Sequence, residues 1–182
     1  MDLAFHKLKR AFIDAPILMH FDLDKPIILQ TDASGFAIAG ILCQFDGFGV
    51  LRPVAFYSRK CNSAEQNYDT YDRELLAIIK SFKHWRHYLE DARHHFLVCC
   101  DHKNLEYFMT MKTLSRRQAR WAEILSQYDF KIEHLDGKRN PADGPSRRPD
   151  YEKGYERPTM ALLAGMAMKE FGEDLMTRIK LC

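Results

Sequence analysis

The hydrophobic pattern of this 182-residue chain changes its period at Asp69, and this change limits the folds open to it. Before Asp69 the apolar residues lie in short runs, and after it they recur every three or four residues. Short runs between turn residues are typical of β-strands, whereas the second pattern is typical of an amphipathic helix. The expected helix has Asp69 or Thr70 as its cap. Its apolar stripe is formed by Leu75, Ile78, Ile79, Phe82, Trp85 and Leu89.

Three strands are expected before this helix, at residues 27–31, 37–42 and 54–58. The first two are separated by the turn residues Ser34 and Gly35, and a glycine-rich loop precedes the third. Strands that follow one another this closely predict an antiparallel meander.

The second half of the chain alternates strand and helix. Residues 96–100 form an almost continuous apolar run, which predicts a central strand buried on both faces. A helix is expected over residues 114–128, and a last strand over 130–134 with Phe130 and Ile132 facing inward. The order of these elements predicts an α/β (α+β) fold, a mixed five-stranded sheet with helices packed on it.

The length of the chain is enough for one core of ordinary size. We expect a leading helix within residues 1–20, a single domain over 21–150, and a C-terminal linker with a methionine-rich helix over 151–182. Two interpretations of the tail stay open, a surface helix without a special role and a helix that binds a partner.

Charge and cysteine usage exclude several classes of protein. The 27 Lys and Arg residues nearly balance 25 Asp and Glu residues, so a nucleic-acid surface would have to be a local patch. The five cysteines form no CxxC pair, which favours reduced thiols over a zinc site or a disulfide framework. The absence of an apolar run of about 18 residues predicts no membrane segment, and we expect an intracellular protein.

Four acidic residues lack an evident cationic partner: Asp32, Glu74, Asp101 and Asp143. Each alone has an ordinary explanation, such as a solvated strand end, a helix N-terminus or, for Asp143, a helix cap. If they converge, their repulsion requires hard divalent cations. Two Mg²⁺ ions about 3.5–4 Å apart support in-line displacement at phosphorus. The set therefore predicts a phosphodiester hydrolase.

Several ordered motifs also resemble a known family. They are TDAS around Asp32, PVAFYSRK, AEQNYDTYDRELLAI, DHKNLEYF, LSRRQARWAEILSQYDFKIEH and NPADGPSRRPDY. Together, from about Phe5 to Tyr151, they are similar to the ribonuclease H domain of gypsy-type LTR retrotransposon polyproteins, which combine reverse transcriptase and RNase H.

The resemblance implies a ribonuclease H-like fold and cleavage of the RNA strand of RNA:DNA hybrids. It implies Asp32, Glu74, Asp101 and Asp143 as catalytic, metal-binding acids holding two Mg²⁺ ions, with Mn²⁺ as a substitute. It further implies reverse transcriptase and integrase parts of the same polyprotein as partners, and a location in a cytoplasmic virus-like particle or in the nucleus.

Two departures from the family pattern bear on activity. Pro145 stands where the family commonly has Leu, and the Gly144–Pro145 pair is expected to reshape the turn that carries Asp143. The loop GKRNPAD lacks the His found in cellular ribonucleases H, so His102 and His134 become candidates for proton transfer, or are simply hydrogen-bonded. A weak or inactive domain that binds nucleic acid or protein is the alternative.

A hybrid duplex is recognised through its backbone and 2′-hydroxyls. The expected contacts, beside the acids, are Ser34, Lys103, Asn104, Lys138, Arg147 and Arg148. Further basic residues lie along the two predicted helices, and they either contact phosphates or form a solvated face. They are Lys80, Lys83, Arg86, His87, Lys112, Arg116, Arg117 and Arg120.

Overall fold

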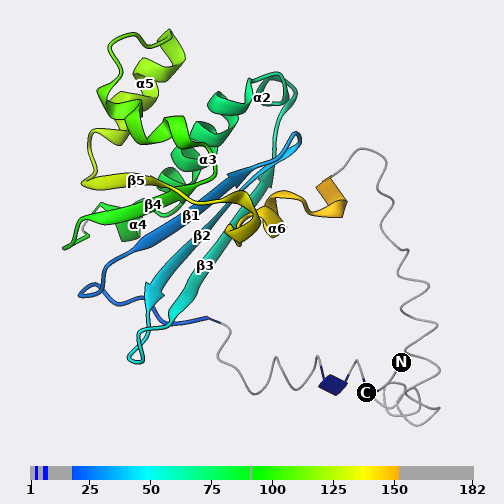
Figure 1. Cartoon of the computed structure of the whole chain (residues 1–182), viewed down its shortest axis with the longest axis vertical. Helices are drawn as coiled ribbons and strands as arrows, with labels where there is room; N and C mark the ends of the chain where they lie inside the picture. The colour runs from blue at the N-terminus through cyan, green and yellow to red at the C-terminus, as the bar shows by residue number, and fades with distance from the viewer. Residues whose placement is uncertain (1–2, 4–5, 8–17, 91, 152–182) are drawn as a thin grey trace, which may run out of the picture. The chain divides into compact units, whose positions relative to one another are not determined.

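Five strands form one mixed sheet. Its strands are β1 (Ile28–Ala33), β2 (Ala37–Phe45), β3 (Leu51–Lys60), β4 (Phe96–Cys100) and β5 (Phe130–His134). Their order across the sheet is β3-β2-β1-β4-β5 (Figure 1). The first three strands are antiparallel neighbours, while β4 runs parallel to β1 and β5 runs parallel to β4. The predicted meander and mixed five-stranded sheet are therefore confirmed.

The computed structural model describes residues 3, 6–7, 18–90 and 92–151. The sheet and its helices lie within the unit Met1–Tyr151. The predicted C-terminal linker and helix, and most of the predicted leading helix, lie outside the described residues. The division into 1–20, 21–150 and 151–182 stays a prediction.

The strand boundaries follow from local chemistry. Pro53, which has no N–H to donate, is tolerated in β3 because β3 is an edge strand. The register shifts between Leu42 and Cys43, where Pro53 stands opposite Cys43. Gly49 adopts a φ of 76° in the β2–β3 turn, a conformation that a side chain disfavours. The third strand, Leu51–Lys60, is longer than the predicted residues 54–58.

Among the described helices, all but two are short. The α-helices are α2 (Ser63–Gln66), α3 (Thr70–His84), α4 (Arg86–Leu89), α5 (Arg116–Leu125) and α6 (Asp143–Ser146). The 3₁₀ helices of the same part of the chain are η1 (Lys103–Thr110), η2 (Gly137–Arg139) and η3 (Pro149–Tyr151). None of the described helices is both long and apolar enough to cross a bilayer.

Capping residues determine where the main helices begin. Asp69 caps α3, since its side chain accepts a hydrogen bond from the Asp72 backbone N–H. Ser115 and Gln118 form a capping box at the start of α5. The helix predicted to continue to Leu89 is interrupted at Trp85, so that segment is two helices.

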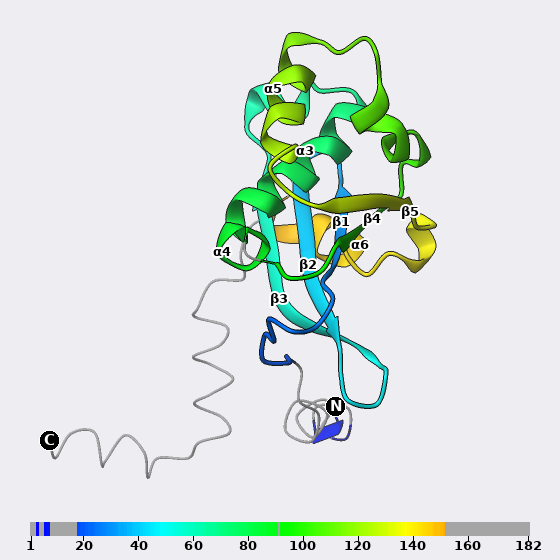
Figure 2. The same cartoon turned by 90° about the vertical axis from the view of Figure 1, so that its left-hand side faces the viewer.

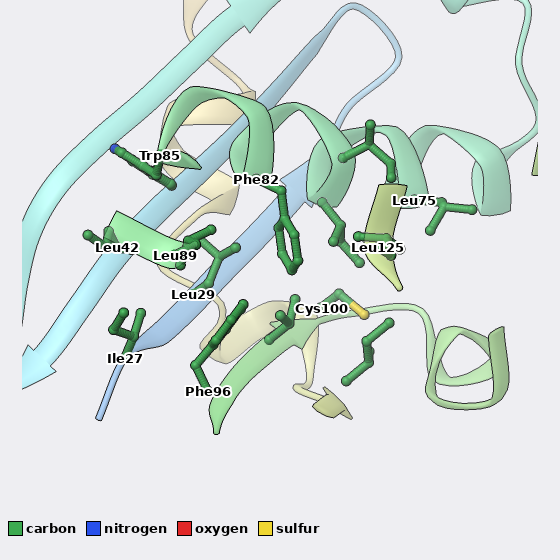
Figure 3. Close-up of a cluster of buried hydrophobic side chains, with 14 of the residues drawn as sticks. Ile27, Leu29, Leu42, Leu75, Phe82, Trp85, Leu89, Phe96, Cys100 and Leu125 are labelled. Carbon is green, nitrogen blue, oxygen red and sulfur yellow. The ribbon is translucent and has the colours of Figure 1, made fainter. Parts of the chain in front are cut away.

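The main core lies between the sheet and α3. Leu29 and Leu42 of the sheet belong to the same buried cluster as Phe82 of α3, and all three are fully buried (Figure 3). The Phe82 ring packs 5.5 Å from that of Phe96 and 5.0 Å from that of Phe130, measured between ring centroids. Burying one such aromatic side chain contributes about 1.5–3 kcal/mol, so this layer holds α3 firmly on the sheet.

The opposite face of the sheet carries α6 (Figure 2). Ala142, just before α6, packs on Ile41 and Cys43. On this face β4 is less covered than predicted, because Leu97 and Cys99 are only half-buried while Phe96 and Val98 are buried. The prediction of a strand buried on both faces was therefore wrong.

Candidate active site

Three carboxylates meet at one end of the sheet. Asp32 lies near the end of β1, Asp101 directly follows β4, and Glu74 lies in the second turn of α3. One ligand oxygen from each lies within 4.8 Å of the other two. Because β1 and β4 are parallel neighbours, both strands end at the same edge, and α3 brings Glu74 to it. The expected convergence is found for these three acids.

Glu74 is 2% exposed, and its two oxygens have different environments. Oε1 accepts a hydrogen bond of 3.2 Å from the Ala33 backbone N–H. Oε2 is buried and, among the described residues, has no hydrogen-bond partner. Burial, followed by the charges of Asp101 and Asp32, raises the pKa of Glu74 to about 9. An ionised Glu74 therefore requires a cation in this site.

Asp32 is 3% exposed and accepts a hydrogen bond from the Ser146 hydroxyl. Burial raises the pKa of Asp32, the Ser146 hydrogen bond opposes this rise, and the charges of Asp101 and Asp143 add to it. The pKa of Asp32 therefore stays raised despite its hydrogen bond. A positive ion nearby would stabilise the ionised carboxylate in this environment.

The segment after β5 closes the site from the other side. Asn140 is buried, donates a 2.8 Å hydrogen bond from Nδ2 to the carbonyl oxygen of Thr31, and accepts one from the Ala142 N–H. A Cβ at Gly137 would lie 3.2 Å from Oδ2 of Asp101. The chain therefore passes close to the carboxylates at a glycine and is held there by Asn140.

Asp143 is the first residue of α6 and lies outside the group of three. Its carboxylate accepts a hydrogen bond from Nε of Arg147. The helix cap is Ala142, and no side chain makes a capping hydrogen bond, so the capping interpretation was wrong. The negative charge of Asp143 contributes to the raised pKa of Asp32. Its place among the metal ligands stays a prediction.

The turn that carries Asp143 is regular despite Gly144 and Pro145. Both belong to α6, and a proline in the first turn of a helix removes a donor that has no partner there. The Pro145 carbonyl accepts a 3.0 Å hydrogen bond from the Ser58 hydroxyl, which fixes the helix against β3. Gly144 and Pro145 therefore lie in a regular helical turn, and the expected reshaping relative to the family stays a prediction.

The predicted substrate-binding residues have diverse surroundings. Ser34 donates from its hydroxyl to the Ala37 carbonyl and accepts from two backbone N–H groups, so it stabilises the β1–β2 turn. Lys103 and Asn104 are exposed at the start of η1, just after Asp101. Asp143 is the main cause of the raised pKa of Arg147, with smaller effects from Asp32 and Asp101.

Arg148 pairs with Asp150 at 2.9 Å. Lys138 lies in η2, and its side chain is outside the described part of the structure. His102 has a buried Nδ1 without a partner among the described residues and packs edge-on against Tyr71. His134 is exposed at the end of β5, where its backbone N–H donates to Glu106. Their roles stay predictions.

Sequence reasoning missed three residues of the site, Gly137, Asn140 and Ser146. None is acidic or basic, so a search for unpaired charges passes over them. The signal that would have found Asn140 and Ser146 is the motif NPADGPSRR, which also contains Asp143.

Comparisons with known proteins agree with this geometry. The family described as "RNase H-like domain found in reverse transcriptase" matches residues 22–128. The Tf2-3 and Tf2-4 transposon polyproteins of Schizosaccharomyces pombe are 41% identical over 147 residues, which is 79% of this chain. The chain spans 11% of the length of these relatives.

Solved structures share the fold at low sequence identity. Native prototype foamy virus protease-reverse transcriptase matches with a TM-score of 0.57 and 13% identity, over 85% of this chain and 21% of that one. LC11-RNase H1 matches with a TM-score of 0.50 and 18% identity, over 65% of this chain and 91% of that one. The family model covers most of the folded part of the chain, and the Tf2 polyproteins are its relatives. The chain therefore belongs to the family of RNase H-like domains found in reverse transcriptases.

Proposed function

We propose that this domain is a divalent-metal-dependent endonuclease that hydrolyses the RNA strand of RNA:DNA hybrids during retrotransposon reverse transcription. The observation that carries the proposal is the meeting of Asp32, Glu74 and Asp101 within 4.8 Å, with a buried Glu74 oxygen that has no partner among the described residues. With all three acids ionised, such a group is unfavourable unless cations bind to it.

The donor set fits hard cations. It consists of carboxylate oxygens, which suit Mg²⁺ and Mn²⁺ and are poor ligands for soft metals. Asp32, Glu74, Asp101 and Asp143 would hold two Mg²⁺ ions, with Mn²⁺ as a substitute. Bound ions of this kind supply an activated water and stabilise the leaving oxygen of a phosphodiester.

The chain's own residues orient the acids and the substrate. The Ala33 N–H fixes one oxygen of Glu74, and the Ser146 hydroxyl fixes Asp32. Substrate phosphates would be bound by the exposed groups around the site, and His102 or His134 would transfer protons. The proposed substrate contacts are Ser34, Lys103, Asn104, Lys138, Arg147 and Arg148.

The curated relatives support a wider context. They are transposon polyproteins, and one structural neighbour is a foamy viral protease-reverse transcriptase in complex with an RNA/DNA hybrid, with a TM-score of 0.52 and 16% identity over 85% of this chain and 20% of that one. We therefore propose that this domain acts with reverse transcriptase and integrase parts of a polyprotein, in a cytoplasmic virus-like particle or in the nucleus.

The direct test is cleavage of a hybrid labelled on either strand, in Mg²⁺ and in Mn²⁺. Wild-type protein should cut only the RNA strand. Asp101→Asn and Glu74→Gln should each reduce the rate at least about a hundredfold, because each removes a metal ligand. Asp129→Asn, which changes an exposed acid beside His95, is the matched control and should keep the wild-type rate.

Equal rates for wild type, Asp101→Asn and Glu74→Gln would contradict the proposal. Tight binding of the hybrid without cleavage in either metal would instead identify a binding module without catalytic activity.

A further inference from the structure

A polar cleft lies on the helical side of the molecule. It has a volume of about 640 Å³ and is bounded by α2, α3 and α5. We call it the α3–α5 cleft and define it by Lys80, Lys83, Arg116, Arg120 and Trp121 in its wall. The acidic site of Asp32, Glu74 and Asp101 contributes no residue to this wall.

The acids nearest the cleft are already neutralised. Glu65, in the wall, pairs with Arg59 at 2.7 Å. Asp72 accepts hydrogen bonds from Arg117 at 3.0 Å and from Gln118 at 2.8 Å. Each carboxylate is therefore paired with an arginine other than those that define the cleft, and the charge of Lys80 adds a smaller effect that lowers the pKa of Glu65.

The four cations that define the cleft are not neutralised in the same way. Within the described residues, no hydrogen bond or ion pair joins Lys80, Lys83, Arg116 or Arg120 to an acid. Lys83, Arg116 and Arg120 are exposed, and Lys80 is half-buried. The cleft therefore has a local excess of positive charge on a chain whose net charge is only +2.

The spacing of these cations is unfavourable for the free protein. Arg116 and Arg120 are four residues apart on α5, and Lys80 and Lys83 are three apart on α3, so each pair repels along its helix. The first turn of α5 also contains no acid to complement the helix dipole. A bound polyanion would remove both penalties at once.

The aromatic residues of the cleft favour phosphate over bases as the bound group. The guanidinium of Arg117 lies 3.7 Å above the Tyr68 ring and 5.9 Å from the centroid of Trp121. Stacking on a nucleobase needs a free aromatic face, which Arg117 already covers on Tyr68. Because the Tyr68 ring is covered, the cations of the cleft are better suited to contacts with the sugar–phosphate backbone than with bases.

The cleft and the acidic site lie along the same helix. Lys80 and Lys83 follow Glu74 by six and nine residues, which is roughly 9 and 14 Å along the axis of α3. One strand of a duplex carries a phosphate about every 3.4 Å of its axis. Along the axis of α3, the two sites are therefore offset by about the rise of a few nucleotides.

We infer that the α3–α5 cleft is a second nucleic-acid contact, which binds the phosphate backbone of the same substrate away from the point of cleavage. This inference rests on the proposed function for the identity of the polyanion. It assigns Lys80, Lys83, Arg116 and Arg120 to substrate affinity and gives them no part in the hydrolysis itself.

The test compares two double variants that lose the same charge. Lys83→Gln with Arg120→Gln removes two cations of the cleft, whereas Lys25→Gln with Lys131→Gln removes two cations elsewhere on the surface. Binding of a labelled hybrid of about 20 base pairs is measured by fluorescence anisotropy in chelator over a range of salt concentrations. Thermal unfolding checks that both variants fold like the wild type.

The cleft variant should bind about tenfold more weakly near physiological salt, and the slope of log affinity against log salt should become shallower by about 1–2. The control should keep the wild-type slope. In cleavage assays the cleft variant should raise KM and leave kcat unchanged. The exchange Lys83→Arg with Arg120→Lys, which keeps the charges, should restore affinity.

The failures of the two proposals are distinguishable. Wild-type cleavage together with an unchanged slope in the cleft variant overturns the inference and leaves the nuclease proposal standing. A reduced slope without any wild-type cleavage supports the cleft as a nucleic-acid site and overturns the nuclease. Loss of binding to poly-glutamate, with hybrid binding intact, overturns the inference in favour of an acidic protein partner.

Discussion

Glu74 combines deep burial with a carboxylate oxygen that no described donor contacts. Its position is fixed by α3, whose apolar residues hold the helix on the sheet, and by the Ala33 N–H. At neutral pH and without metal, this residue keeps its proton, since its pKa is raised to about 9. Metal binding and deprotonation of Glu74 are therefore coupled.

The pH dependence of stability follows from this shift. The unfolded chain releases the Glu74 proton near pH 4.5, whereas the folded, metal-free protein keeps it up to about pH 9. The contribution of protonated Glu74 to stability is complete below pH 4.5 and is lost as the pH rises toward 9. Relative to Glu74→Gln, the free energy of unfolding of the wild type should fall by up to about 1.4 kcal/mol per pH unit as the pH rises through this window.

Urea unfolding of both proteins in chelator, at several pH values across that window, measures the difference. Added Mg²⁺ or Mn²⁺ should restore wild-type stability most at the alkaline end, where Glu74 is most readily ionised. Parallel pH curves for wild type and Glu74→Gln would show that Glu74 ionises normally in the fold.

The hydrogen bond from Ser146 to Asp32 affects the titration of that acid. This hydrogen bond lowers the pKa of Asp32 against the effect of burial, so Ser146→Ala should raise that pKa further. Metal affinity should fall about 10- to 100-fold, as for other groups that orient a ligand, and the acid limb of the pH–rate profile should move to higher pH. Ser126→Ala, which removes a hydroxyl bonded to the Glu123 carbonyl, is the control. An unmoved acid limb in Ser146→Ala would rule out this role.

At the scale of elements, prediction succeeded where the apolar residues recur with a clear period. The stripe from Leu75 to Phe82 predicted α3, and the alternation of residues 130–134 predicted β5. The helix α2 was missed because it has only four residues, and η1 was missed because it is a 3₁₀ helix with just two buried residues, Leu105 and Phe108. The half-buried face of β4 was missed because coverage of Leu97 and Cys99 depends on other segments of the chain.

The contact between α3 and β2 can be tested at one glycine. A Cβ at Gly40 would lie 2.4 Å from Oγ of Ser81 and 3.1 Å from the Trp85 ring. Gly40→Ala should therefore lower the free energy of unfolding by about 1–3 kcal/mol, through overpacking. Urea unfolding of the variant and the wild type measures this loss.

Gly144→Ala is the control for this prediction. Gly144 lies in α6, and a methyl group added to it would meet no other described segment within 4 Å. Alanine also favours a helix over glycine by up to about 1 kcal/mol. This variant should unfold at the wild-type urea concentration or slightly above it. Equal stability of Gly40→Ala and wild type would mean that α3 lies farther from β2 than the structure shows.

At the scale of the whole molecule, the site depends on which strands are neighbours. The sequence predicted that Asp32 and Asp101 would meet if their strands were adjacent, and β1 and β4 are adjacent and parallel. That adjacency is a pairing across some 68 residues, which local patterns do not encode; the resemblance to a family supplied it. The hydrogen bonds from Asn140 and Ser146 to the β1 region were unpredictable for the same reason.

Anomalous diffraction from crystals of the protein soaked in Mn²⁺ would locate the metal ions directly. Two Mn²⁺ peaks about 4 Å apart should appear between Asp32, Glu74 and Asp101, with Asp143 contacting one of them. Crystals of Asp101→Asn should lose at least one of the peaks. An absence of Mn²⁺ at these carboxylates in the wild type, at concentrations that support cleavage, would contradict the account.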